Sequence, residues 1–413
     1  MISLNKIKTY EYITALVAAF PLLGQKGSVY VIIIWSIYSL FIAIKLKSFR
    51  PDRKDIIDIL ILSSLYLAYT ISYFFATDKH EVGKLLERAL PFLLFPIFMI
   101  INKYLINEKT RMLTMRVFSF SCIVLCLYVW TVIFSQGIEK VFKSDDYYNP
   151  VIRNIFSDTT GMHLPYLGML FVFAALLFLY DLLSVKGKSF IFYIIRLLSI
   201  VFLLFSVAAF MARMALFIFV IVGIFFCLKK IRSAKQLIGI GIIGIIIVGS
   251  VLMLPSSQRR INESLSAKYE LPHAGQSSEE VNFRYGVYHC VKEILSEYWL
   301  TGVGVDNVQK KLDECYSSYT YRNSDDYMHT TYNSHNQYFD IMLKYGIVGL
   351  ILFVISLLWG VKTKDTVYQG FLIVIFIALL SENVFSRQAG IVFFTFFNTL
   401  FFVTTRRHKK GLE

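Results

Sequence analysis

Charged residues are scarce in this chain. They make up 17% of its 413 residues, whereas hydrophobic residues make up 56% and the mean hydropathy is +0.59. A soluble domain carries about one quarter charged residues, so the composition excludes an ordinary soluble enzyme. The net charge of +14 comes from lysines and arginines in short clusters between apolar runs. No continuous basic surface is predicted, and we therefore expect no nucleic acid as a partner.

Metal-ligand patterns are also lacking. The sequence has no Asp-x-Asp and no His-x-x-x-His spacing, and only His329 with Asp325 and Asp326 offers a weaker alternative. We therefore expect no metal and no cofactor. A small-x-small cleavage site is missing after the short basic start, so we expect the first apolar segment to be an uncleaved helix.

Long apolar runs are what the chain has instead. Runs of roughly 17 to 25 residues suffice to cross the hydrocarbon core of a bilayer. About twelve are predicted, at 10–25, 28–46, 56–77, 89–105, 117–136, 164–184, 190–211, 213–229, 237–255, 338–361, 366–384 and 388–405. The stretch 190–228 would form a helix of roughly 58 Å, nearly twice the core thickness, so it must turn back near Arg213.

The basic clusters predict the orientation. Short loops on one side hold about 23 lysines and arginines, against about 9 on the other, so the positive-inside rule places both termini in the cytoplasm. The sequence therefore predicts an all-α integral membrane protein of the bacterial inner membrane, with about twelve transmembrane helices and a large helical periplasmic loop between the ninth and tenth. The predicted divisions are helices 1–9 in 1–255, the loop in 256–337, and helices 10–12 with a cytoplasmic tail in 338–413.

The large loop reads as a folded cap. Ser277 and Glu280 have the spacing of a capping box for a helix that runs to about Trp299. On that helix Arg284 shares an apolar stripe with Tyr288, Val291 and Leu295, which predicts a buried or membrane-facing arginine. Of the five cysteines, Cys122, Cys126 and Cys227 lie inside predicted spans as small apolar residues. Cys290 and Cys315 lie in the loop, where an oxidising periplasm would allow a disulfide.

Arginines at apolar boundaries point to an anionic ligand. Arg213 lies between two predicted spans, and Arg284 lies on the apolar stripe. Lys84 and Arg88, four residues apart, lie at the outer end of another predicted span. An interfacial arginine can also simply extend to the lipid headgroups, so an anchoring role is the alternative. A planar guanidinium binds phosphate oxygens bidentately, and the outer leaflet offers such oxygens as lipid pyrophosphates. A transferase working without ATP needs a donor of this kind, with its own leaving group.

Histidines are candidates for the base that an acceptor hydroxyl requires. His335 is the best placed of the seven, at the junction of the loop with a span. His163 precedes Pro165 at another outer helix entrance and, with Asn336, is a candidate substrate-binding residue. A lone histidine is more often structural, so position alone leaves both readings open.

The sequence resembles the O-antigen ligase superfamily, which includes lipid A-core ligases and O-antigen polymerases. The matching segments are Asn282-Phe283-Arg284-Tyr285, Tyr298-Trp299-Leu300-Thr301-Gly302-Val303-Gly304-Val305-Asp306-Asn307, Ser334-His335-Asn336-Gln337-Tyr338 and Lys344-Tyr345-Gly346-Ile347-Val348-Gly349-Leu350. They all lie between residues 282 and 350. The family usually has Ser-Arg-Gly at its first arginine, where this chain has Ala212-Arg213-Met214.

The resemblance implies a metal-independent, inverting membrane glycosyltransferase acting at the periplasmic face. Its donor would be an undecaprenyl-pyrophosphate-linked glycan, held by Arg213 and Arg284, and His335 would be the catalytic residue. The acceptor would be lipid A-core for a ligase or a growing glycan for a polymerase, and sequence does not separate the two. A protein O-glycosyltransferase is less favoured, since no extra domain is expected after the last span. A lipid-linked glycan transporter would place its ionisable groups near the bilayer midplane.

Overall fold

The structure, a computed structural model, describes residues 4–46, 51–137, 150–185, 187–230, 271, 283–318 and 331–408. Within these ranges every regular element is a helix. The elements are α1 (Leu4–Val17), α2 (Phe20–Lys45), α3 (Arg53–Leu62), α4 (Ser64–Phe75), α5 (Lys79–Ala89), α6 (Pro91–Ile101), α7 (Glu108–Ser135), α9 (Pro150–Thr160), α10 (Leu164–Ser184), α11 (Phe190–Ala209), α12 (Arg213–Lys230), α15 (Phe283–Tyr298), α16 (Val308–Tyr316), α18 (Gln337–Leu358), α19 (Thr366–Ser381), the 3₁₀ turn η1 (Val384–Ser386) and α20 (Gln388–His408).

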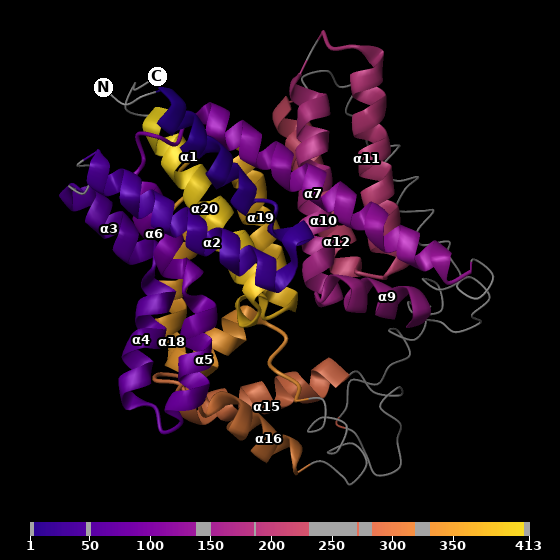
Figure 1. The fold of residues 1–413 in the computed structure, drawn as a ribbon. Helices are drawn as coiled ribbons and strands as arrows, with labels where there is room; N and C mark the ends of the chain where they lie inside the picture. The colour runs from indigo at the N-terminus through magenta and orange to yellow at the C-terminus, as the bar shows by residue number, and fades with distance from the viewer. Residues whose placement is uncertain are drawn as a thin grey trace.

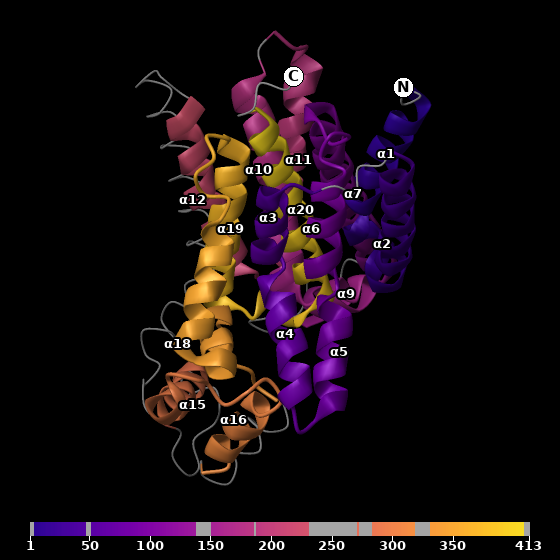
Figure 2. The same ribbon diagram turned by 90° about the vertical axis from the view of Figure 1, so that its left-hand side faces the viewer.

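The helices form a bundle with two distinct ends. Figures 1 and 2 show both termini at one end and α15 and α16 at the other, with the α4–α5 hairpin extending beside them. The core lies between α7, α10, α19 and α20, where the rings of Phe118, Phe173, Phe371 and Phe397 pack within 4.9–6.1 Å of one another. Such aromatic packing fixes the order of the helices on which the site depends.

Six helices of the described residues are long and apolar enough to cross a membrane, which makes this a multi-pass membrane protein. They are α2, α7, α10, α11, α18 and α20, and a seventh span results if the pair α3 and α4, bent by 66°, counts as one. The expected number of about twelve is therefore not confirmed. Helices lie at most of the other expected spans but are shorter, such as α19 with 16 residues, or charged at both ends, such as α12. The expected span 237–255 lies outside the described residues.

The first two expected spans begin and end at other residues than predicted. The chain breaks at Ala18–Ala19, between α1 and α2, and not between residues 25 and 28. Pro21 explains this position, because proline fits the first turn of a helix but lacks the N–H that an interior position needs. A second break follows at Gly24, whose φ of 66° together with a ψ of −174° is a conformation essentially restricted to glycine.

The predicted turn near Arg213 is confirmed. Helix α11 ends at Ala209, Met211 has a φ of 63°, and Arg213 is the first residue of α12. The amide N–H of Ala212 donates to the carbonyl oxygen of Val207 at 3.1 Å and closes the turn. The reversal therefore uses only the three residues between Ala209 and Arg213.

The described part of the large loop folds against α18. Val287, Cys290 and Val291 of α15 pack with Leu312 and Tyr316 of α16 in a small core of their own. Helix α15 ends at Tyr298, one residue before the expected end. The predicted capping box at Ser277 and Glu280 lies outside the described residues, as do His329, Asp325 and Asp326.

Several basic residues at the end that carries the termini are bound to carboxylates. Arg111 donates to both carboxylate oxygens of Asp365, at 2.8 and 2.9 Å, and Arg406 pairs with Asp58. These arginines therefore tie α7 to the start of α19 and α20 to α3. Basic residues of these clusters therefore also serve helix packing.

Candidate functional site

Arg213 is fixed by the turn in which it lies. Arg153 of α9 donates to the carbonyl oxygen of Phe210 at 2.7 Å, just before Met211. From the other side α10 comes very close, since a Cβ added at Gly168 would lie 2.7 Å from the Cβ of Ala212. Contacts from two neighbouring helices therefore define where the first turn of α12 begins. The N-terminus of a helix also favours anions, because its first amide groups have no partner within the helix.

One cavity brings the two expected arginines together. Its volume is about 410 Å³, and Arg213 from α12 and Arg284 from α15 both line it. The rest of the lining is mostly apolar and comes from α10, the α11–α12 turn, α12 and the end of α19: Pro165, Tyr166, Met169, Met211, Ala212, Met214, Ala215, Ile218, Ala378, Ser381, Glu382 and Val384. A cationic wall beside an apolar wall suits an amphiphile with an anionic head.

Arg284 lies at the end of the stripe that the sequence predicted. Val291 is buried, and Tyr288 and Leu295 pack against the same small core. The Arg284 side chain is 37% exposed, so it is less buried than expected and opens toward the cavity. It can reach a ligand there without leaving its helix.

A carboxylate stands between Arg284 and His335. Nη2 of Arg284 is 3.8 Å from Oε1 of Glu382, and Nδ1 of His335 is 3.9 Å from Oε2 of the same side chain. Glu382 and His335 are only 16% and 17% exposed. Partial removal from water strengthens such charge interactions. The structure thus joins the cavity that contains both arginines to the histidine through one glutamate.

The segment that carries Glu382 is held from several sides. The hydroxyl of Tyr166 on α10 donates to the carbonyl oxygen of Asn383 at 2.8 Å. The amide N–H of Phe385 donates to Oε1 of Gln337 on α18 at 2.8 Å. The Asn383 side chain bonds to the hydroxyl of Ser334, which is buried. Helices α10 and α18 therefore fix the backbone that follows α19.

His335 has an unusual backbone conformation. Its φ is 43°, its amide N–H donates to Oδ1 of Asn333 at 2.9 Å, and its ring centroid lies 5.8 Å from that of Tyr332. A positive φ costs a non-glycine residue of order 1–3 kcal/mol and is common at functional sites. The conformation occurs two residues before α18 begins at Gln337.

The side chain of Asn336 forms hydrogen bonds to the backbone of two helices. Its amide oxygen accepts from the N–H groups of Tyr338 and Phe339 and so caps α18, and its Nδ2 donates to the carbonyl oxygen of Leu380 at 3.1 Å. Both ends of the amide are occupied by protein groups. As a substrate-binding residue Asn336 stays a prediction, and its visible role is to join α18 to α19 beside His335.

His163 lies in the same electrostatic neighbourhood. It occupies the N-cap position of α10, and its ring centroid is 5.8 Å from that of Tyr166. Burial lowers the pKa of His163 below its usual 6.5; Glu382 acts against this shift, and the neighbouring Arg387, His335 and Arg153 add to it. His163 is thus placed near the candidate site as a neutral imidazole at neutral pH.

The second pair of expected cations lies outside the cavity lining. Lys84 forms an ion pair with Glu81 at 2.7 Å on an exposed face of α5. Arg88 donates to the carbonyl oxygen of Ser386 at 2.7 Å. The structure therefore does not bring Lys84 to the other arginines, and it connects Arg88 to the site through the backbone beside Arg387.

The glycine motifs explain how the loop docks on α18. Gly302 and Gly346 have φ angles of 71° and 65°, and a Cβ on either would meet the backbone of the other's segment. The N–H of Val303 donates to the carbonyl oxygen of Leu343 at 2.7 Å, and that of Ile347 to Trp299 at 2.8 Å. Two chain segments distant in sequence thus approach as closely as backbones can. This contact holds the C-terminal end of α15 against α18.

Asp306, which follows this motif, anchors the loop to the α4–α5 hairpin. Its Oδ2 accepts from the N–H and hydroxyl of Thr77 at 2.8 and 2.7 Å, and from the N–H of Asp78 at 3.1 Å. Burial alone would raise the pKa of Asp306, but these hydrogen bonds outweigh it and lower the pKa. The carboxylate is therefore a charged structural contact.

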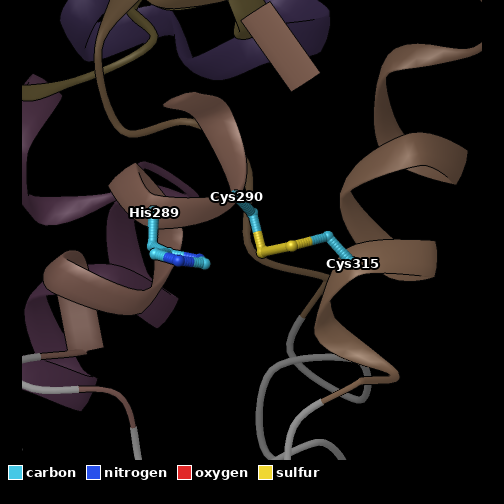
Figure 3. Close-up of side chains that lie close together, drawn as sticks. All are labelled: His289, Cys290 and Cys315. Carbon is cyan, nitrogen blue, oxygen red and sulfur yellow. A yellow bond between two sulfur atoms is a disulfide. The ribbon is translucent and has the colours of Figure 1, made fainter. Parts of the chain in front are cut away.

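Cys290 and Cys315 are joined by a disulfide that links α15 to α16 (Figure 3). A ring nitrogen of His289 and the two sulfur atoms lie within 4.8 Å of one another, as in a metal site. Both sulfur atoms are used by the disulfide, and a metal would need the thiolates. We therefore assign this group to the structure of the cap.

Glu382 is the residue of this site that the sequence prediction missed. It follows an apolar run at the end of α19, where a carboxylate is costly unless it has a partner. That rule pointed to Arg213 and Arg284, and applied to acidic residues it would have found Glu382. Arg153 gave no such signal, because its contact with the α11–α12 turn depends on the tertiary structure.

Comparison with known proteins supports the resemblance seen in the motifs. The family model described as O-Antigen ligase matches residues 192–354, a range that contains Arg213, Arg284 and His335 but ends before Glu382. No protein of a curated collection matches the chain. Members of this family are membrane glycosyltransferase-like enzymes of the ligase or polymerase type. Over this segment, which is less than half of the chain, the protein is similar to the O-antigen ligase superfamily.

Proposed function

We propose that this protein is an O-antigen ligase, which transfers a glycan from undecaprenyl pyrophosphate to lipid A-core at the periplasmic face of the inner membrane. One observation carries the proposal: Arg213 and Arg284 line the same cavity, and Glu382 joins that cavity to His335. The family supports ligase- or polymerase-type activity. The donor, the acceptor and the roles of individual residues are our inference.

In the proposed mechanism the arginines hold the donor. Guanidinium groups bind pyrophosphate oxygens and stabilise the charge that develops as the pyrophosphate leaves. The apolar lining formed by Met169, Met211 and Ile218 would take the first part of the isoprenyl chain. The cavity then contributes affinity through the lipid and catalysis through the two charges.

His335 acts as the general base. It takes the proton of the acceptor hydroxyl while the hydroxyl oxygen attacks the anomeric carbon. The bond between that carbon and the pyrophosphate oxygen breaks, and the pyrophosphate leaves with the electron pair. Because attack comes from the face opposite the leaving group, the anomeric configuration inverts. The reaction needs no metal ion, since the arginines supply the positive charge.

The test is glycan transfer by purified protein in detergent, with EDTA present. His335→Ala should lose about 10² to 10⁴ in rate while it still binds lipid-linked donor. Arg213→Ala and Arg284→Ala should weaken donor binding as well as turnover, and lysine should rescue each only in part because it lacks the bidentate fork. His80→Ala and Arg116→Ala, both exposed, are the matched controls. Transfer by His335→Ala at the wild-type rate, or a divalent ion needed for activity, would contradict the mechanism.

A polymerase with the same donor is the second candidate, because the family includes that activity. Glycan profiles of a deletion strain separate the two. Loss of a ligase leaves lipid A-core without glycan, whereas loss of a polymerase leaves core with a single repeat. A protein O-glycosyltransferase would leave both lipid forms unchanged and alter glycoproteins. A transporter would show no transfer with purified components.

A further inference from the structure

The carboxylate of Glu382 is shared between two partners. Its Oε1 faces Nη2 of Arg284 at 3.8 Å, and its Oε2 faces Nδ1 of His335 at 3.9 Å. Both distances permit charge interaction but are longer than hydrogen bonds. Glu382 is therefore positioned to strengthen its contact with either partner through a small movement of its side chain.

The backbone of Glu382 does not share this freedom. Tyr166 holds Asn383, which directly precedes η1, while Gln337 and Arg88 hold Phe385 and Ser386 within η1. Helix α19 ends directly before it, at Ser381. Any change in the contacts of Glu382 must therefore come from its side chain, which moves between fixed neighbours.

An anion in the cavity would compete with Glu382 for Arg284. The guanidinium lines the cavity, and phosphate oxygens bind it bidentately, which a carboxylate at 3.8 Å does not do. If the anion takes Arg284, the carboxylate loses one of its two partners. The nearest group that can gain from its negative charge is then the imidazole of His335.

We infer that Glu382 is a positioning residue that couples donor binding to the base, an inference that rests on the proposed function. Without donor, the carboxylate neutralises Arg284. With donor bound, it turns to Nδ1 of His335, fixes the imidazole with Nδ1–H toward the carboxylate, and directs Nε2 to the acceptor hydroxyl. The acceptor proton moves to Nε2 as the glycosidic bond forms, and Glu382 stabilises the resulting imidazolium until water takes the proton.

Other ionisable groups near the site also affect its electrostatics. Arg387, Arg153 and His163 all act within the same electrostatic field as Glu382 and His335. Most of these groups are cationic or can become so. Glu382 is the acidic group in this set. Removal of its negative charge should therefore change the electrostatic interactions of both Arg284 and His335.

The test is Glu382→Gln, which keeps the size and removes the charge. Turnover should fall by about 10- to 100-fold, because the imidazolium loses its counter-charge. Binding of undecaprenyl pyrophosphate should become about three- to tenfold tighter, because the Glu382 carboxylate no longer competes with the donor for Arg284. A residue that only held the fold together would weaken both. Glu293→Gln, which alters an exposed carboxylate on α15, is the matched control and should change neither.

Wild-type turnover in Glu382→Gln, or a parallel loss of binding and turnover, would overturn the inference. If this variant does not fold, Glu382→Asp serves instead: it keeps the charge but shortens the reach, and should show a smaller loss of turnover with binding unchanged or tighter. The proposed function has a separate test, which is glycan transfer by His335→Ala. An inactive His335→Ala beside a fully active Glu382→Gln would leave the transferase in place and remove only the coupling.

Discussion

At the scale of single residues, the site depends on side chains whose neighbours are fixed. His335 sits between Asn333, which accepts from its N–H, and Asn336, which caps α18. Its positive φ of 43° follows from these two contacts, since the chain must leave the loop and enter the helix within one residue. The general base we propose is thus placed by hydrogen bonds of two asparagine side chains.

His163 gives a pH prediction. Its folded-state pKa lies below 6.5, so the folded protein binds fewer protons than the unfolded chain as the pH falls below that value. Stability should be fully present above pH 6.5 and be lost as the pH drops toward the folded-state pKa. Melting temperatures of purified protein between pH 7.5 and 5.5 measure this loss. The variant His163→Gln cannot gain a proton at this position, so its melting temperature should fall less over the same pH range.

The matched control is His80→Gln, because His80 is exposed on α5. This variant should lose stability on acidification as the wild type does. If His163→Gln and the wild type show the same acid dependence, burial of His163 is not what makes the protein sensitive to pH. Glu382, Arg387, His335 and Arg153 surround His163, so His163→Gln should be measured first in otherwise unchanged protein.

At the scale of elements, the two glycine breaks make a direct comparison possible. Gly346 in α18 has φ and ψ of 65° and −164°, and Gly24 in α2 has 66° and −174°. This region of backbone conformation is essentially restricted to glycine. A Cβ at Gly346 would collide with the backbone of Leu300, whereas nothing lies within 4 Å of one at Gly24.

Gly346→Ala should therefore destabilise the protein more than Gly24→Ala. Both share the cost of the backbone conformation, and only Gly346→Ala adds a steric clash, so we expect a difference of about 1–3 kcal/mol in the free energy of unfolding. Unfolding by SDS in mixed micelles measures it. Equal losses would mean that the loop can move away from α18 without cost, and that the close approach is not needed.

The disulfide gives the second prediction for an element. Cys290 and Cys315 are separated by 25 residues, and closing a loop of this length stabilises a fold by roughly 3 kcal/mol in the chain-entropy model. The double variant Cys290→Ser, Cys315→Ser should unfold at correspondingly lower SDS. In denatured protein, alkylation should modify three of the five cysteines before reduction and five afterwards. Five modifications without reductant would show that the bond does not form.

At the scale of the whole molecule, the candidate site lies where helix ends converge. Helices α10, α12 and α18 begin there, and α11 and α19 end there, so His163, Arg213, His335 and Glu382 all belong to the same end of the bundle. Figures 1 and 2 show the chain termini at the opposite end. Chemistry that uses a lipid-linked donor would thus take place at one surface of the membrane.

This arrangement predicts a topology. A phosphatase fused after Ser318 should be active and a fluorescent protein dark, and the reverse should hold for fusions after Glu413. A fusion at Gly187, in the connection between α10 and α11, should behave like the one after Glu413, since this connection lies at the termini end in Figure 1. The basic residues predict that this end is cytoplasmic. A cytoplasmic signal after Ser318 would move the proposed site to the wrong face for its donor.

The sequence by itself determined the class of protein, the turn before Arg213 and the resemblance to the O-antigen ligase family. Each depends on local information: the length and polarity of apolar runs, the limit that a bilayer sets on a helix, and short motifs that keep their spacing. Arg213, Arg284 and His335 could be named for the same reason. Arg213 and His335 carry a costly or titratable group next to an apolar span, and Arg284 carries one on an apolar stripe.

The tertiary structure decided what these residues can do together. Arg213 and Arg284 line one cavity, and Arg88 donates to a carbonyl oxygen beside Arg387. Both arrangements depend on how the helices pack, which no local sequence pattern predicts. The span boundaries also changed, because Pro21 and the glycine breaks shift helix ends that hydropathy places only by length. Glu382 gains its two partners from α15 and from the chain before α18. A charge in an apolar setting shows that a partner is needed, and only packing determines which partner it has.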